Sequence, residues 1–155
     1  MLMLDKAAPV AVRQLAQITC PAPTESWRPY PHSEVVSALS DRMQARGLKV
    51  KSSRLTLIDG AMYPAKGIRV EVKGARLFGS FDLVPAGEFV PGAVPSLGLR
   101  NSIDKSYALT VLIGMRVMAC SNGVLYVERG VQVSRKHTSG LELEGAFDSA
   151  LDAYE

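Results

Sequence analysis

The sequence predicts a single α+β domain, in which a curved and mainly antiparallel β-sheet carries about three helices on one side. The chain has 155 residues, the length of one ordinary domain with its own core. Apolar residues recur at helical spacing near residue 33 and again near the C-terminus. Between these segments the apolar period changes to two, and the short connections favour an antiparallel meander.

Residues 1–32 are expected to form an N-terminal arm, because five prolines interrupt them. Proline is excluded from helix interiors and favours extended geometry in the residue before it. A short helix over Val10–Gln17 is the one regular element that fits. We expect the single tryptophan, Trp27, together with Tyr30, to anchor the arm to the body.

Residues 33–84 read as a helix followed by a β-meander. Ser33 is the expected N-cap, and Gly47 marks the C-terminal end of the helix. Asp59-Gly60 is a turn signal between the first two strands. The expected strands cover 48–57, 67–73 and 76–84. A Pro- and Gly-rich loop then leads to the second half, over residues 97–155.

The second half is expected to alternate between strands and helices. Ser102 or Asp104 would cap a helix over Tyr107–Ile113, and Gly114 would end it. Asn122-Gly123 favours a tight turn. The expected strands are Leu97–Arg100, Arg116–Cys120, Val124–Val127 and Val131–Arg135. The closing helix, Glu142–Tyr154, carries an apolar stripe of Leu143, Phe147, Leu151 and Tyr154.

Charge is distributed unevenly along the chain. The net charge is +3, but all 18 Lys and Arg precede residue 141, after which five acidic residues follow without a base. The densest basic stretch is 42–76, and such an excess attracts polyanions. The other interpretation is a solvated protein face. The candidate nucleic-acid-binding residues are Arg42, Arg46, Lys49, Lys51, Arg69 and Lys73.

Three motifs of the second half resemble one known family when taken together. They are Leu97-Gly98-Leu99-Arg100-Asn101-Ser102-Ile103-Asp104-Lys105-Ser106, Gly114-Met115-Arg116-Val117-Met118-Ala119-Cys120-Ser121-Asn122 and Arg135-Lys136-His137-Thr138. In this order and spacing they resemble the phage- and plasmid-borne family known as domain of unknown function nine-three-two. Ile103 stands where that family has histidine. The resemblance implies a mobile-element origin and a DNA-related or host-conflict role, and it supplies no reaction.

The same motifs contain a candidate anion site. Hydroxyl and amide side chains at a predicted helix N-terminus can donate to a phosphate, although capping that helix is the competing role. The cluster at 135–138 combines cations with a hydroxyl, and simple solvent exposure is its alternative. The candidate anion- or ligand-binding residues are Arg100, Asn101, Ser102, Lys105, Arg135, Lys136, His137 and Thr138.

Cysteine and histidine are too sparse for a zinc site or a disulfide framework. The chain has two cysteines, Cys20 and Cys120, and two histidines. We therefore expect no metal, no cofactor and a reducing, cytoplasmic setting. Cys120 with His137 and either Asn122 or Asp104 suggests a thiol hydrolase, whereas a buried structural cysteine is the more common case. There is no apolar run of 18 residues and no secretory signal pattern.

The leading functional hypothesis is a non-enzymatic nucleic-acid-binding protein of a phage or plasmid. Its narrower form is a protein that binds or anneals single-stranded DNA. Ring-forming annealing proteins build a basic groove from a similar helix and meander, which is fold-level analogy. We also expect a homo-oligomer, because the stripe of the closing helix must be covered. The first alternative is a counter-defence protein that binds a host immune protein or sequesters a nucleotide signal. The second is the Cys/His hydrolase.

Overall fold

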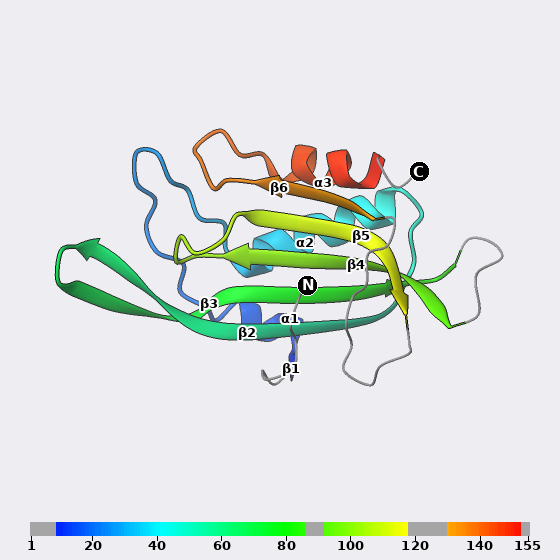
Figure 1. The fold of residues 1–155 in the computed structure, drawn as a ribbon, viewed down its shortest axis with the longest axis horizontal. Helices are drawn as coiled ribbons and strands as arrows, with labels where there is room; N and C mark the ends of the chain where they lie inside the picture. Colours follow the sequence, from blue (N-terminus) through cyan, green and yellow to red (C-terminus); the bar gives the residue numbers. More distant parts are fainter. Residues whose placement is uncertain (1–8, 86–91, 118–129, 153–155) are drawn as a thin grey trace.

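The computed structural model describes residues 9–85, 92–117 and 130–152. Within these ranges the chain forms three helices and an open antiparallel sheet of order β1-β2-β3-β4-β5-β6, so each strand pairs with the next in sequence (Figure 1). The predicted α+β class and meander are confirmed. The elements are β1 (Pro9–Val10), α1 (Val12–Leu15), α2 (His32–Ala45), β2 (Val50–Ala65), β3 (Ile68–Leu83), β4 (Ala93–Ser102), β5 (Leu109–Val117), β6 (Val131–Arg135) and α3 (Leu143–Asp152).

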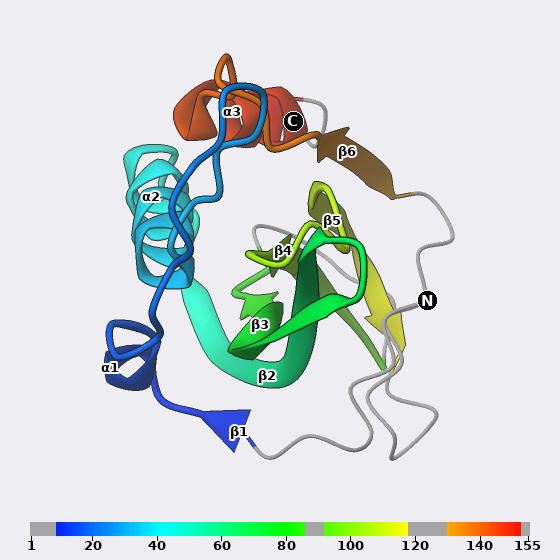
Figure 2. The same ribbon diagram turned by 90° about the vertical axis from the view of Figure 1, so that its left-hand side faces the viewer.

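The hydrophobic core lies between the sheet and the three helices, which share one side of it (Figure 2). Alternate residues of each strand point into this core, as a sheet buried on one face requires. The closing helix contributes Leu143, Phe147 and Leu151, all 7% exposed or less. These three residues of the apolar stripe are therefore covered within the chain, whereas Tyr154 lies outside the described residues, and a homo-oligomer stays a prediction.

The arm is anchored to the body as the sequence predicted. Trp27 and Tyr30 are both buried. The Tyr30 hydroxyl donates to the Leu141 carbonyl oxygen at 2.5 Å, which ties the arm to the segment before α3.

Helix α2 begins one residue earlier than expected. Its N-cap is Pro31, so the prediction of Ser33 as the cap is wrong, whereas Gly47 (φ +70°) ends the helix as expected.

The helix predicted over Tyr107–Ile113 is wrong, because residues 109–117 form strand β5. β5 lies between β4 and β6, and both of its faces are covered: Thr110 and Val111 point to opposite sides and are 2% and 1% exposed. A strand buried on both faces shows no alternation of polar and apolar residues, so its sequence resembles a buried helix. Gly114 lies inside the strand rather than at a helix end.

The turn predicted at Asp59-Gly60 is also wrong. β2 and β3 each have 16 residues, and their turn is at residues 66–67, where Gly67 has φ +78°. At Asp59 and Gly74 the strands instead bulge, and Gly74 N donates to Asp59 Oδ1 at 2.7 Å. The hairpin extends well beyond its neighbours (Figure 1).

Some of the other predicted elements are confirmed, and the rest fall on residues outside the described ranges. The strands over Leu97–Arg100 and Val131–Arg135 are confirmed as parts of β4 and β6. The closing helix is confirmed as α3. The strand predicted over Arg116–Cys120 lies partly outside the described residues. The strand predicted over Val124–Val127 and the Asn122-Gly123 turn lie wholly outside them. In the described ranges no helix has the length and apolarity needed to cross a membrane.

Gly60 occupies a close approach that a side chain would disrupt. A Cβ there would lie 2.1 Å from Asp104 Oδ2 and 3.0 Å from the Ala75 Cβ. We expect Gly60→Ala to lower the free energy of unfolding by about 1–3 kcal/mol, as overpacking does. Gly145→Ala, in α3 with open space around it, should instead stabilise by up to about 1 kcal/mol. Urea denaturation of both variants measures the two signs, and equal effects would contradict the close packing at the bulge.

Candidate functional site: the helix-free face of the sheet

Within the described chain the helices lie on one side of the sheet and leave its other face without a helix (Figure 2). The strand register places polar side chains on this helix-free face. The strand register aligns one residue from each strand in a row across it. That row consists of Thr56, Phe78, Arg100, Thr110 and Ser134. Hydroxyl and guanidinium groups thus stand side by side on this face, where the opposite face presents leucine, valine and isoleucine.

Two arginines of this face gather on one tyrosine. The guanidinium carbons of Arg100 and Arg76 lie 4.5 Å and 5.4 Å from the centre of the Tyr107 ring. Phe78 meets the same ring edge-on, with centroids 6.1 Å apart. The distances from the two guanidinium groups to the Tyr107 ring are within the range of cation–π attraction. Tyr107 therefore holds two cations next to each other that would otherwise repel.

The two arginines differ in how their charge is balanced. Arg76 Nε donates to Asp104 Oδ2 at 3.2 Å, and that carboxylate is 1% exposed. Arg100 has no carboxylate partner among the described residues. Its Nη2 donates to Thr110 Oγ1 at 3.3 Å, and its buried Nε has no hydrogen-bond partner. Within the described ranges, the positive charge of Arg100 in the middle of the face is therefore not paired with a carboxylate.

A buried polar network lies on the other side of the sheet, around Asn101. The Asn101 side chain is fully buried. Its Nδ2 donates to the Tyr30 carbonyl oxygen at 3.1 Å and lies 2.9 Å from His32 Nδ1. Its Oδ1 lies 2.7 Å from His137 Nε2. His32 Nε2 in turn lies 2.7 Å from the Gly74 carbonyl oxygen.

These partners fix the protonation of both imidazoles. The Tyr30 carbonyl can only accept, so Asn101 must direct its amide nitrogen there and its oxygen to His137. His32 Nδ1 therefore accepts, and its Nε2 carries the proton donated to Gly74. Burial lowers the pKa of His32, against a hydrogen bond to Gly74 that raises it. Burial likewise lowers the pKa of His137.

The predicted anion-binding residues do not form one site. Asn101 and His137 are buried and hydrogen-bonded to each other within this network. Ser102 Oγ accepts from Tyr107 N at 3.0 Å. Lys105 lies over the Trp27 ring, 4.9 Å from its centre. Arg135, Lys136 and Thr138 are exposed at the end of β6. Arg135 pairs with Leu109, which points to the helix side, so it lies on the opposite face from Arg100.

The predicted nucleic-acid-binding residues are also dispersed. Arg42 donates twice to Asp148, at 2.9 Å and 2.7 Å, and Arg46 Nη2 donates to Asp152 at 2.5 Å. These two arginines tether α2 to α3. The exposed lysines Lys49 and Lys51 lie at the base of the β2–β3 hairpin, whereas Arg69 and Lys73 lie toward its tip. The hairpin is about 50 Å long at the usual rise per residue of a strand.

The residues that would carry a thiol hydrolase are not assembled within the described chain. Cys120 and Asn122 fall outside it, and His137 Nε2 is already bonded to Asn101. Asp104 is engaged by Arg76 and by the Ser106 backbone and hydroxyl. The free thiol of Cys20 has its pKa raised by burial and then by Glu34. Across the described ranges, no three His, Cys, Asp or Glu side chains are placed to hold a metal ion.

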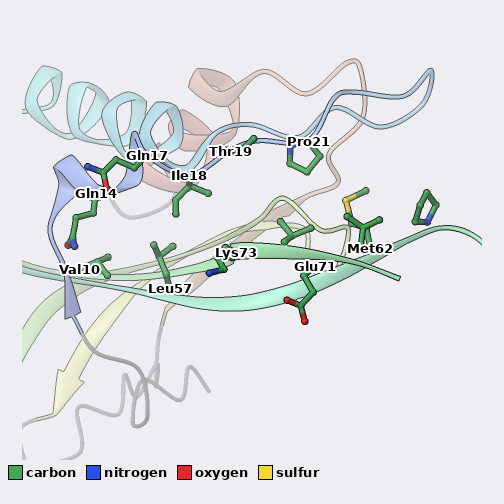
Figure 3. Close-up of a pocket in the computed structure, with 13 residues that line it drawn as sticks. Val10, Gln14, Gln17, Ile18, Thr19, Pro21, Leu57, Met62, Glu71 and Lys73 are labelled. Atoms are coloured by element: carbon green, nitrogen blue, oxygen red, sulfur yellow. The ribbon is translucent and has the colours of Figure 1, made fainter. Parts of the chain in front are cut away.

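An apolar groove of about 850 Å³ lies on the helix side, between the arm and the hairpin (Figure 3). Ile18 points from the arm toward the strands, where Leu57 and Met62 form part of the floor. Glu71 points away from the arm, and Lys73 lies at the rim (Figure 3). The groove is separate from the polar face, because the sheet itself lies between them.

Sequence reasoning missed Arg54, Arg76 and Tyr107 as members of the helix-free face. The signal was present in the alternation Arg76, Phe78, Ser80, Asp82 along β3, which sets a polar face against buried leucines. The predicted break between strands at residue 59 and the predicted helix over 107–113 hid how these residues meet.

No family model, no curated protein and no solved structure matches this chain. The resemblance to domain of unknown function nine-three-two therefore stays a prediction, which rests on the three motifs. Of these, the first and the third meet at Asn101 and His137.

The buried imidazoles make stability depend on pH. Both pKa values are lower in the folded chain than the ordinary 6.5, so the unfolded chain takes up protons first as the pH falls. We expect the melting temperature to drop as the pH is lowered from 7.5 to 5. His137→Gln retains a donor toward Asn101 without titrating and should reduce this drop. A pH profile of His137→Gln that parallels the wild type would contradict the assigned network.

The arginine tether is expected to matter for stability and not for ligand binding. The Arg42 guanidinium lowers the pKa of Asp148, and Arg46 adds to this effect. Because the pair is partly exposed, we expect Asp148→Asn to cost about 1 kcal/mol of unfolding free energy. Arg42→Gln should cost a similar amount, and the double variant no more than either alone. Additive losses in a double-mutant cycle would refute the direct pairing.

Proposed function

We propose that this protein binds single-stranded nucleic acid, without catalysis, along the helix-free face of its sheet. The observation that carries the proposal is Arg100, which has no carboxylate partner among the described residues and lies beside Arg76 on the face that carries no helix. Arginines supply the donors that phosphate and base edges accept. Of the hydroxyls in the row, that of Ser134 is exposed and can add a donor to the nucleic-acid backbone, whereas Thr56 and Thr110 are buried.

The arrangement of the cations favours a polymer over a small anion. A site for a nucleotide signal would bring Arg100, Lys105 and Arg135 around one pocket. Instead Lys105 covers Trp27, and Arg135 lies on the opposite face from Arg100. The cations of the helix-free face are spread along the strands, with Arg54 exposed near one end and Arg69 toward the hairpin tip. A linear ligand can contact such a row.

A sheet face that carries no helix in the described part of the chain also suits single strands better than duplexes. Unpaired bases can lie against a sheet and accept hydrogen bonds from its side chains, and this mode serves several single-strand-binding folds. A recognition helix in the major groove is the usual alternative for duplex DNA. Here the helices pack their apolar faces on the core. The motif resemblance to phage and plasmid proteins agrees with a role in their DNA transactions.

Arg54 offers the cleanest test, because its side chain is exposed and opposite Ser80 in the register. We expect wild-type protein to bind fluorescent dT15 at 50 mM salt, more tightly than a 15-base-pair duplex. Arg54→Glu should weaken dT15 binding about tenfold and flatten the plot of log K against log salt by about 0.7, the value of one phosphate contact. Fluorescence anisotropy measures both.

Arg13→Glu is the matched control, because it makes the same charge change on α1, on the helix side of the sheet. It should leave dT15 affinity near the wild-type value. Equal losses from both variants would reduce the interaction to overall net charge. No binding of dT15 at 50 mM salt would overturn the proposal, and tight binding of a mononucleotide alone would favour the counter-defence alternative.

A further inference from the structure

The tip of the β2–β3 hairpin combines exposure, charge and an aromatic ring. Tyr63 is 70% exposed, and it is the single aromatic side chain of the described residues that is largely open to solvent. Lys66 lies in the turn and is exposed as well. Arg69 is exposed, and its pKa is raised first by a hydrogen bond to Glu71 and then by one to Tyr63. Arg69 Nη1 also donates to Glu71 Oε1 at 2.9 Å.

The bulge at Asp59 and Gly74 decides which face of the hairpin these side chains join. Leu57 points to the helix side, and strict alternation would send Tyr63 there too. After the bulge, Met62 packs with Val72 in a small cluster on the arm side instead. Tyr63 therefore lies on the opposite, helix-free face, as Glu71 does where it points away from the arm (Figure 3).

From these observations we propose that the hairpin tip is a second contact for the same nucleic-acid strand, in which Tyr63 stacks on a base while Lys66 and Arg69 contact phosphates. This inference rests on the proposed function, and it assigns the tip a task that the centre of the face does not perform. At the centre, the Tyr107 ring is occupied by Arg76 and Arg100. The exposed Tyr63 ring is open for stacking, an interaction that tolerates every base.

The spacing of the two contacts sets a minimum length for the ligand. Thr56 marks the row that contains Arg100, and Tyr63 follows seven residues along β2. At about 3.3 Å per residue these positions are about 23 Å apart. A stacked strand advances about 3.4 Å per nucleotide, so about seven nucleotides bridge the two contacts. A strand shorter than this engages one contact at a time, and a longer one gains from linking both.

Length-dependent binding tests the proposal. Wild-type protein should bind dT15 at least about tenfold more tightly than dT4, because the second contact becomes intramolecular. The variant with Tyr63→Ser, Lys66→Ser and Arg69→Ser should lose most of this gain and leave dT4 affinity within about twofold of the wild type. Its slope of log K against log salt for dT15 should flatten by about 1.4, two single-strand phosphate contacts. All three positions are exposed, so an unchanged melting temperature is expected.

A variant of opposite sign separates a specific tip contact from general damage. Glu71 is 72% exposed and neutralises Arg69. Glu71→Gln should therefore raise dT15 affinity, by about twofold or more, without changing dT4 affinity. Arg13→Ser, on the helix side, serves as the neutralising control and should change neither.

The outcomes distinguish this inference from the proposed function. If Arg54→Glu weakens binding but the tip variant matches the wild type on dT15, the central face binds nucleic acid and the tip contact is rejected. If the tip variant weakens dT4 and dT15 equally, the two-contact arrangement is rejected as well. If wild-type protein binds neither oligonucleotide at 50 mM salt, the proposed function itself is overturned.

Discussion

The structure depends on one buried amide. Asn101 joins the arm through the Tyr30 carbonyl, the start of α2 through His32, and the segment after β6 through His137. His32 extends this connection to Gly74 in the hairpin bulge. Residues 30–32 and His137, which are distant from each other in sequence, therefore meet at this one side chain, and its polar atoms are all satisfied. Such groups are costly to bury unpaired, so the network specifies a single arrangement of these segments.

This network explains why two sequence motifs that look like ligand-binding patterns are structural. Asn101 and His137 belong to the first and third motifs of the suspected family, and both point into the protein. The polar residues that remain available lie one position away along the chain. Arg100 precedes Asn101 on β4 and points to the other face, as alternation along a strand demands. The sheet thus divides the first motif: Asn101 has a structural role on the helix side, and Arg100 lies on the helix-free face.

The sequence predicted the class of fold, the α2 and α3 helices and the meander, because amphipathic periodicity is a local property of Val35, Leu39, Met43 and of the α3 stripe. It failed where burial is set by distant neighbours. Thr110 and Val111 carry no periodic signal, since both are buried although they point to opposite faces of the sheet. Arg42 and Arg46 looked free because their partners, Asp148 and Asp152, follow about a hundred residues later. The gathering of Arg76, Arg100 and Tyr107 needed the strand register, which local sequence does not determine.

The paired bulge in the hairpin has a consequence for length variation among related chains. Side chains alternate between this bulge and a second register shift, which lies between Met62 and Ala65, so adding or removing two residues from each strand between these two points would change reach and keep both faces intact. A single-residue insertion would exchange the faces, placing Met62 in solvent and turning Tyr63 toward the arm. We therefore expect natural variants of this hairpin to differ in length by steps of two residues per strand, or to carry a compensating second bulge.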